Sequence, residues 1–494
     1  MKLNFYGSHA AELFSREVEE STNGVIEHLM VTDENDPDRG FTPVSLPGYP
    51  WDDTMWSRDA GTFLRELVLW GKIHEAKLLC GSLIDLVGKN EEGYYMYPVY
   101  FFKGKVRAGT ELDGTGAVII GMVLLWQRLE NGDVMKERIE HFLLGEGSPA
   151  MCIMHQLEKT PLLAGTGEFG GGCDDNEHIN VVQNNLMRLS MLAVAKLMRA
   201  KGDIAHAEQC EGAAHRIAEG IRKYLVDENG CYIWCVEPDT MQPDPAVIGA
   251  EINYGAGLLN GVLSMTADVC GLDPAADDGF FDMAAMETTF DTLHNMPPRK
   301  EIFDENGCWV QFIKYRHGST GPSYGQGYAI QSMLLLNRTE MAGKAIKFMA
   351  EATYDLPVEQ TELVRKSPYY FLERIYLPYS VEMGVDLWCG CGEINLVNVA
   401  EPMKVARMVA GIDSTPELTR LIPRLPEGFD GFEATDVPFA IQNGVLYGDL
   451  ICKKEQNGLR FNLKLKESRL ENVELRWMDK KYCAQNVSEL DVVL

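Results

Sequence analysis

The chain has 494 residues, 46% of them hydrophobic, which is enough for one large domain with a smaller one or for three modest domains. Its formal net charge is −28, which argues against nucleic acid and anionic membranes as partners, because both bind basic patches. The same charge suits a soluble protein with a neutral or cationic small substrate.

The N-terminal segment and the cysteines together favour the cytoplasm. Residues 1–20 contain no apolar stretch long enough for a signal peptide. The longest apolar run, 118–126, is about half the length of a membrane span. Twelve cysteines are scattered along the chain, which is typical of reduced, mostly buried thiols. Cys389 and Cys391 lie close together, but without a second pair at zinc-finger spacing we expect neither a metal nor another cofactor.

In chain order, apolar residues recur at helical spacing from about residue 9 to residue 411. Two kinds of helix alternate along this series. Every second helix is apolar nearly all round, as in 115–126, which predicts burial on every side. The helices between them, such as 203–225, carry one apolar stripe and a charged face, which predicts an outer position. The expected helices span about 9–22, 57–72, 74–89, 113–130, 134–157, 177–200, 203–226, 250–267, 278–293, 323–337, 339–354 and 394–411.

The simplest architecture with this alternation is a closed double ring of helices, so the predicted fold class is mainly α, an (α/α)6 toroid. Connections from an inner to an outer helix are mostly short, whereas those from an outer to an inner helix are long. The long loops should emerge at one end of the ring, around the N-termini of the inner helices, and such loops usually carry function. They span 23–56, 90–112, 158–176, 227–249, 294–322 and 355–393.

The helical pattern ends near residue 411, and strands follow from about residue 420. Asn457 and Gly458 lie between two runs of alternating residues, which is a strong hairpin signal. We therefore predict two domains: a catalytic helical barrel over residues 1–419 and a small antiparallel, sandwich-like β domain over residues 420–494.

Each long loop ends in polar residues at the start of an inner helix, with aromatic residues among them. Asp59 in a first helical turn complements the helix dipole, but Arg58 beside it does not. Aromatic rings stack on the C–H faces of sugars, and paired polar groups hold sugar hydroxyls by bidentate hydrogen bonds. The similar loop ends therefore predict a sugar site. The candidate binding residues are Trp56, Arg58, Asp59, Glu111, Asp113, Asp175, Glu251, Tyr324 and Trp388.

Cleavage of a glycosidic bond needs two carboxyl groups, one of them an acid that protonates the leaving oxygen. Glu168 is the best candidate for this acid, because flanking glycines let the backbone approach a substrate closely. Phe169 beside it could exclude water and raise the pKa of the acid. Asp174, Asp175 and Glu177 compete for the role, although capping of the next helix also explains them.

The second carboxyl group activates water or attacks the sugar directly. We expect it in the loop before the last inner helix, where Glu382 and Glu393 are the candidates. Glu393 also fits a purely structural role at the helix start. The choice between the two stays open at this point.

Two motifs resemble a known group of enzymes. Residues 55–67 are similar to the W-x-R-D helix start of the (α/α)6 exo-acting glycosidases, which include glucoamylases and glycogen-debranching glucosidases. Residues 111–126 resemble the start of the fourth helix of glucoamylases, with Glu111 in place of a glutamine. The segment 405–428, followed by strands, looks more like the end of α-L-rhamnosidases.

The resemblance implies roles for particular residues. In the family the arginine and aspartate bind hydroxyls of the terminal sugar in the deepest subsite, which implies that role for Arg58 and Asp59. The family's acid and base lie in the loops that hold Glu168 and Glu382 here. The expected function is an inverting exo-acting glycoside hydrolase whose partner is a small carbohydrate.

Several alternatives stay open. A sugar phosphorylase, lyase or epimerase could use the same fold, with His178 and His317 as the histidines near the loop ends. A catalytically degenerate sugar-binding protein is a further alternative. In the plainest case Arg58 and Asp59 form only a structural ion pair. The sequence does not determine the sugar, its anomer and linkage, or whether the chain forms a homo-oligomer.

Overall fold

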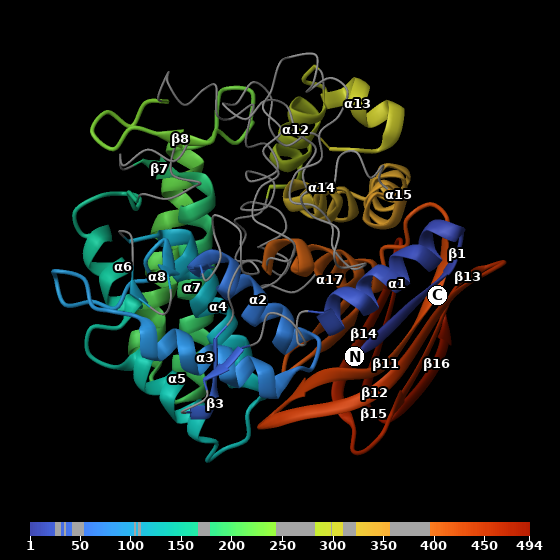
Figure 1. The fold of residues 1–494 in the computed structure, drawn as a ribbon, viewed down its shortest axis with the longest axis horizontal. Helices are drawn as coiled ribbons and strands as arrows, with labels where there is room; N and C mark the ends of the chain where they lie inside the picture. Colours follow the sequence, from blue (N-terminus) through green and yellow to red (C-terminus); the bar gives the residue numbers. More distant parts are fainter. Residues whose placement is uncertain are drawn as a thin grey trace.

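The structure is a computed structural model that describes residues 1–24, 31–33, 36–41, 54–102, 105–106, 110–165, 178–243, 282–297, 299–309, 323–355 and 396–494. The fold is mainly α with strands at the C-terminal end, as the sequence predicts (Figure 1). The helices are α1 (His9–Gly24), α2 (Ser57–Leu69), α3 (Ile73–Leu86), α4 (Leu112–Arg128), α5 (Val134–Leu144), α6 (Pro149–Leu157), α7 (Val181–Ala200), α8 (Ile204–Tyr224), α12 (Met283–His294), α13 (Arg299–Asn306), α14 (Ser323–Leu335), α15 (Thr339–Asp355) and α17 (Leu396–Ala410).

The strands form two larger sheets in the C-terminal region and three small sheets near the helix ends. Figure 1 shows the larger sheets gathered beside α1, on one side of the helices. The strands are β1 (Lys2–Gly7), β2 (Val31–Asp33), β3 (Asp36–Phe41), β4 (Thr54–Trp56), β5 (Tyr100–Phe102), β6 (Lys105–Val106), β7 (Ile179–Asn180), β8 (Cys235–Val236), β9 (Ile412–Ser414), β10 (Thr419–Leu421), β11 (Phe429–Ile441), β12 (Gly444–Glu455), β13 (Gly458–Leu465), β14 (Leu470–Trp477), β15 (Lys480–Val487) and β16 (Glu489–Val493).

Inner and outer helices alternate as predicted. In the inner row α14 packs on α17, α17 on α2, α2 on α4, and α4 on α7. Of the outer helices, α3 packs on α2, α8 on α7, and α15 on α14. The predicted helix 250–267, which would close the ring between α7 and α14, lies outside the described residues.

Burial separates the two rows as the apolar patterns predict. In the inner helix α4, 15 of the 17 residues are buried, and in α7 this holds for 16 of the 20. In the outer helix α8 only 8 of the 21 residues are buried. A helix that buries most of its residues must have neighbours on every side, so α4 and α7 belong to the inside of the ring.

The inner helices run parallel, so their N-termini meet at one end. Gly116, near the start of α4, lies against Leu186, near the start of α7. Gly327 near the start of α14 lies against Glu401 near the start of α17. Polar side chains that open these helices therefore share the same end of the ring, where the sequence analysis places the site.

Besides shifts of a few residues at helix ends, the helices differ from the prediction in three places. The helix expected over 134–157 is two helices, because the chain breaks at Gly145–Ser148 and restarts at Pro149, a residue suited to a first helical position. Helix α7 begins after residue 177, since Asn180 accepts hydrogen bonds from two backbone N–H groups and caps it. Helix α13 lies in a segment expected to be a loop.

The C-terminal strands form sheets with the orders β1-β11-β12-β13-β16 and β15-β14-β10-β9. All of their strand pairs are antiparallel except β10 with β14. The predicted hairpin is confirmed, with Glu455 opposite Gly458. The sequence analysis missed β1, which brings the first residues of the chain into the larger sheet. The proposed division between residues 419 and 420 stays a prediction.

The described cysteines are free thiols, and six of the eight are buried, as the sequence analysis expects. Across the described helices we find no segment with the length and apolarity that a bilayer crossing requires.

A buried carboxyl group joins the outer helices α1 and α15. Glu17 is fully buried, and the Thr353 Oγ1 atom lies 2.7 Å from its Oε1 and 3.0 Å from the carbonyl oxygen of Met349. The Thr353 hydroxyl group has one hydrogen, which it either shares between the two acceptors or donates to Met349 while a protonated Glu17 donates to Thr353. Burial raises the pKa of Glu17 from 4.5 to about 8, which agrees with a protonated Glu17 at neutral pH.

We predict that Glu17→Gln stabilises the protein at alkaline pH. Between pH 4.5 and 8 the unfolded chain releases the Glu17 proton while the folded chain keeps it, so the free energy of unfolding falls as the pH rises. Glutamine cannot ionise, and the variant should gain roughly 2–4 kcal/mol over the wild type at pH 8 and almost nothing at pH 4.5. Urea unfolding at both pH values measures this. Equal stability of the two proteins at pH 8 would contradict a neutral Glu17.

Candidate active site

A buried arginine lies among three carboxylates where α2 and α4 begin. Arg58 Nε is 3.4 Å from Asp59 Oδ1, and Arg58 Nη1 is 3.4 Å from Glu111 Oε1 and 3.6 Å from Asp113 Oδ2. None of the four side chains is more than 7% exposed. Removal of one partner from a buried, hydrogen-bonded ion pair typically costs about 3–5 kcal/mol. We call these four residues the Arg58 cluster.

A short strand fixes the start of α2 and with it the Arg58 cluster. Trp56 is the N-cap residue, and its side chain makes no capping hydrogen bond. Instead Ser57 Oγ donates to the Pro98 carbonyl at 2.6 Å, and the Ser57 N–H donates to the Val99 carbonyl at 3.1 Å. Strand β4 pairs with β5 directly before this point. The β4–β5 pair therefore fixes the position of Arg58 in the first turn of α2.

Two glycines let α2 and α4 approach closely enough for these contacts. A Cβ atom on Gly61 would lie 2.5 Å from the backbone nitrogen of Val118. A Cβ on Gly114 would lie 2.8 Å from Glu111 Oε2 and 2.9 Å from the Cβ of Ser57. Larger residues at either position would push the helices apart, so the contacts of the Arg58 cluster require glycine at both positions.

An aromatic pair lies beside the Arg58 cluster. The rings of Trp56 and Tyr100 have their centroids 5.0 Å apart at an angle of 52°, and both residues are half-buried. The sequence analysis chose Trp56 but missed Tyr100, which is 44 positions away and becomes a neighbour only through the β4–β5 pairing. Partly exposed rings at a polar site can stack on the apolar face of a ligand.

The start of α7 lies beside the start of α4. Asn184 is buried and exchanges hydrogen bonds with both backbone groups of Leu163, at 2.9 Å each. His178 is 5% exposed and pairs through its backbone with Gly165. A Cβ on Gly165 would lie 2.7 Å from the Leu112 side chain, so the segment at Gly165 also lies next to the start of α4.

The structure brings together five of the twelve predicted site residues. Trp56, Arg58, Asp59, Glu111 and Asp113 lie at the starts of two neighbouring helices. Tyr324 belongs to the first turn of α14, which is another inner helix start. The remaining predicted residues lie outside the described part of the chain: Glu168, Asp175, Glu251, Glu382, Trp388 and Glu393.

A second group of charged residues lies deeper in the ring. Glu66 on α2 accepts from Arg407 on α17 at 3.2 Å and lies 3.5 Å from Arg65. Lys404 donates to Glu401 at 2.7 Å, and both are almost completely buried. We call these five residues the inner charge layer. The sequence analysis missed it, although the Arg65–Glu66 pair repeats the pattern of Arg58–Asp59 seven residues later.

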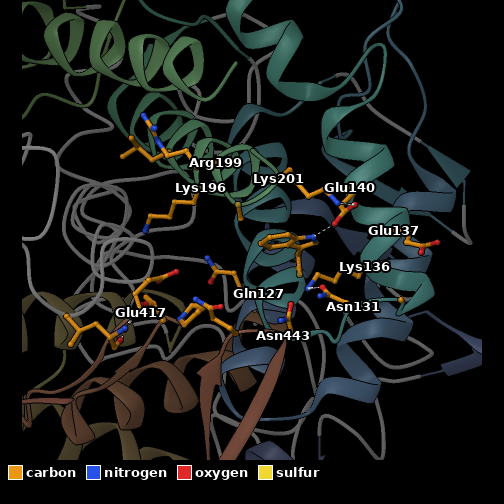
Figure 2. A pocket seen from close by; sticks show the side chains of 18 of the residues that line it. Gln127, Asn131, Lys136, Glu137, Glu140, Lys196, Arg199, Lys201, Glu417 and Asn443 are labelled. Carbon is orange, nitrogen blue, oxygen red and sulfur yellow. Dashed lines mark hydrogen bonds and ion pairs between the residues drawn. The ribbon is translucent and has the colours of Figure 1, made fainter. Parts of the chain in front are cut away.

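Figure 2 shows a groove of about 1350 Å³ that does not include any residue of the Arg58 cluster. Trp126 and Arg199 line it, and they belong to the C-terminal turns of α4 and α7. At 1.5 Å per residue the groove is about 20 Å along α4 from Asp113. Its charged groups already serve protein partners: Arg199 pairs with Glu211 at 2.6 Å.

Lys136 in the same groove lies 4.8 Å from the centre of the Trp126 ring and so occupies one face of it. Lys201 and Trp126 both donate to Glu140, at 2.8 Å each. Trp126 is only 9% exposed, and the charges of Arg199, Lys201 and Glu140 are paired with one another or with other protein groups, so these residues offer little to a ligand. We therefore place the candidate active site at the N-termini of the inner helices.

We predict that Gly114→Ala disrupts the Arg58 cluster. The added Cβ would collide with Glu111 and Ser57, so the variant should lose roughly 1–3 kcal/mol of stability in urea unfolding. Gly212→Ala is the matched control, because Gly212 is exposed in α8 with nothing within 4 Å of an added Cβ. That variant should gain up to about 1 kcal/mol from helix propensity. A stabilised Gly114→Ala protein would contradict the close packing.

Neither a protein-family model nor a curated protein matches the sequence. Solved structures match it in fold. A GH78 family rhamnosidase of Bacillus sp. GL1 is 14% identical with a TM-score of 0.60, over 96% of this chain and 42% of that one. A glycosidase is 13% identical with a TM-score of 0.55, over 81% of this chain and 99% of that one. A glucoamylase from Saccharomycopsis fibuligera is 10% identical with a TM-score of 0.56, over 82% of this chain and 96% of that one.

The chain spans less than half of the rhamnosidase, but the match covers almost all of this chain and so includes its C-terminal strands. The glucoamylase matches a smaller share of this chain. The chain therefore has the (α/α)6 fold of these glycosidases, with a C-terminal β region like that of the rhamnosidase.

Proposed function

We propose that the chain is a glycoside hydrolase that acts on chain ends and removes a terminal sugar from a small oligosaccharide or glycoside with inversion. The observation that carries this proposal is the Arg58 cluster, a cation and three carboxylates at the shared end of the inner helices. The likeness in fold to a rhamnosidase, a glucoamylase and another glycosidase supports this class of reaction.

The Arg58 cluster has the donors and acceptors that a sugar needs. The guanidinium can donate to a sugar hydroxyl while Asp59 accepts from its neighbour, which is the paired arrangement that fixes a pyranose. Glu111 and Asp113 hold Arg58 from the side of α4. Carboxylates beside the sugar also suit a reaction whose transition state is an oxocarbenium-like cation.

The proposed reaction also needs an acid and a base. We assign the acid to Glu168 and the base to Glu382, with Glu393 as the second candidate for the base. An inverting enzyme would hold the acid and base about 6.5–9.5 Å apart, which leaves room for the attacking water.

We predict turnover of at least one nitrophenyl glycoside in a panel that varies the sugar and the anomer. Proton NMR of the first product should show the anomer opposite to that of the substrate, because a single displacement inverts the anomeric carbon. Product of the same anomer would contradict inversion. A requirement for inorganic phosphate would indicate a phosphorylase, and the absence of turnover across the panel would count against a hydrolase.

Glutamine variants test the assigned carboxylates. Glu168→Gln and Glu382→Gln should each lower kcat by roughly 10²–10⁴-fold and leave sugar binding in place, because glutamine keeps the shape but cannot exchange the proton. Glu91→Gln is the matched control, since Glu91 is an exposed glutamate in a connecting loop. Full activity in a Glu168 or Glu382 variant would move that role to another residue.

A further inference from the structure

Three inner helices carry a buried polar residue at the same position, the fourth of the helix. These loop anchors are Thr115 on α4, Asn184 on α7 and Gln326 on α14, and each is 0% exposed. The side-chain oxygen of each anchor accepts a hydrogen bond from a backbone N–H group in the connection that leads into its helix. The donors are Tyr97 at 3.0 Å, Leu163 at 2.9 Å and Trp309 at 2.8 Å, in the same order.

The two amide anchors also bind carbonyl groups. The Asn184 side chain donates to the carbonyl oxygens of Leu163 and Asn180, at 2.9 Å each. Gln326 donates to the Gly307 carbonyl at 3.1 Å. Buried backbone groups need hydrogen-bond partners, and an anchor supplies them from a packed helix. The connection is therefore fixed to the helix start at the anchored residue.

The segment held by Asn184 continues to the Arg58 cluster. Gly165, at the end of this segment, exchanges two backbone hydrogen bonds with His178, at 3.1 Å each. A Cβ atom on Gly165 would lie 2.7 Å from the side chain of Leu112, which stands between two carboxylates of the Arg58 cluster in the sequence. The residues on either side of 166–177 are thus joined to each other beside the start of α4.

The assigned acid, Glu168, lies outside the described residues, but it follows Gly165 by only three positions. Three residues span at most about 11 Å, so the anchored position of Gly165 limits where an acid at residue 168 can act. A misplacement of about 1 Å can lower the rate of a catalysed reaction by about a hundredfold. An anchor next to this segment therefore matters for proton transfer as well as for stability.

We propose that Asn184 is a positioning residue for the acid: it fixes the backbone from which Glu168 reaches the leaving oxygen. The inference rests on the proposed function and adds the start of α7 to the parts on which the reaction depends. Gln326 anchors a different connection, 294–322, which holds neither the assigned acid nor the candidate bases. The two anchors can therefore be compared directly.

Two leaving groups distinguish acid positioning from a general loss of structure. With the sugar that the panel identifies, a phenyl glycoside needs a proton as its bond breaks, whereas a dinitrophenyl glycoside does not, because its leaving group is a weak base. In Asn184→Ala, kcat/KM should fall roughly 10–100-fold for the phenyl glycoside and at most about twofold for the dinitrophenyl glycoside. Glu168→Gln is the reference and should show the same preference more strongly.

Gln326→Ala is the matched control, because it removes an equivalent anchor without touching the connection that holds the acid. It should change kcat/KM for the two substrates by the same factor. Equal losses for both substrates in Asn184→Ala, or no loss, would overturn the proposal. If Glu168→Gln keeps its preference in that case, the proposed function stands without this role for Asn184.

Hydrogen exchange followed by mass spectrometry tests the anchoring without a substrate. Peptides that contain Leu163 should exchange about tenfold faster in Asn184→Ala and at the wild-type rate in Gln326→Ala, and peptides that contain Trp309 should show the reverse. Unchanged exchange at Leu163 would overturn the anchoring.

The two measurements fail in different ways. If the wild type hydrolyses neither substrate, the proposed function fails and the role in acid positioning fails with it, whereas the exchange result still decides whether Asn184 is an anchor. If Asn184→Ala does not fold, Asn184→Leu takes its place in both measurements, because leucine fills the volume of asparagine without its hydrogen bonds.

Discussion

The site depends on one interaction, that of the almost fully buried Arg58 guanidinium group with three carboxylates. Its partners come from two helices, so α2 and α4 must begin at the same level and run in the same direction. Gly61 and Gly114 permit the close approach, and the β4–β5 pair sets the entry point of α2. The same parallel arrangement continues through α7, α14 and α17, and it gathers the helix starts at one end of the ring.

The charges inside the ring occur at two depths. At the helix starts three carboxylates face one arginine, whereas in the inner charge layer three cations face two carboxylates. Apolar residues would fill the same volume at a lower desolvation cost. Retention of so many buried charges is best explained by a polar ligand at the end of the ring.

Local sequence signals predicted most of the fold but only part of the site. The all-round apolar pattern of α4 and the single stripe of α8 reflect their burial directly, so the double ring was predictable. Arg58 and Asp59 stood out because a cation is unusual at a helix start. Tyr100 was missed, because strand pairing between distant residues brings it to the site. Arg65 and Glu401 carried a signal, a charge within an apolar helix, which the sequence analysis did not follow.

The central claim is that a terminal sugar binds where the inner helices begin. A crystal structure of the protein soaked with the monosaccharide that it releases tests this most directly. The account predicts one sugar ring whose hydroxyl groups lie within hydrogen-bonding distance of Arg58 and Asp59. A sugar bound only in the groove beside Trp126 and Arg199, with the Arg58 cluster occupied by water alone, would contradict it.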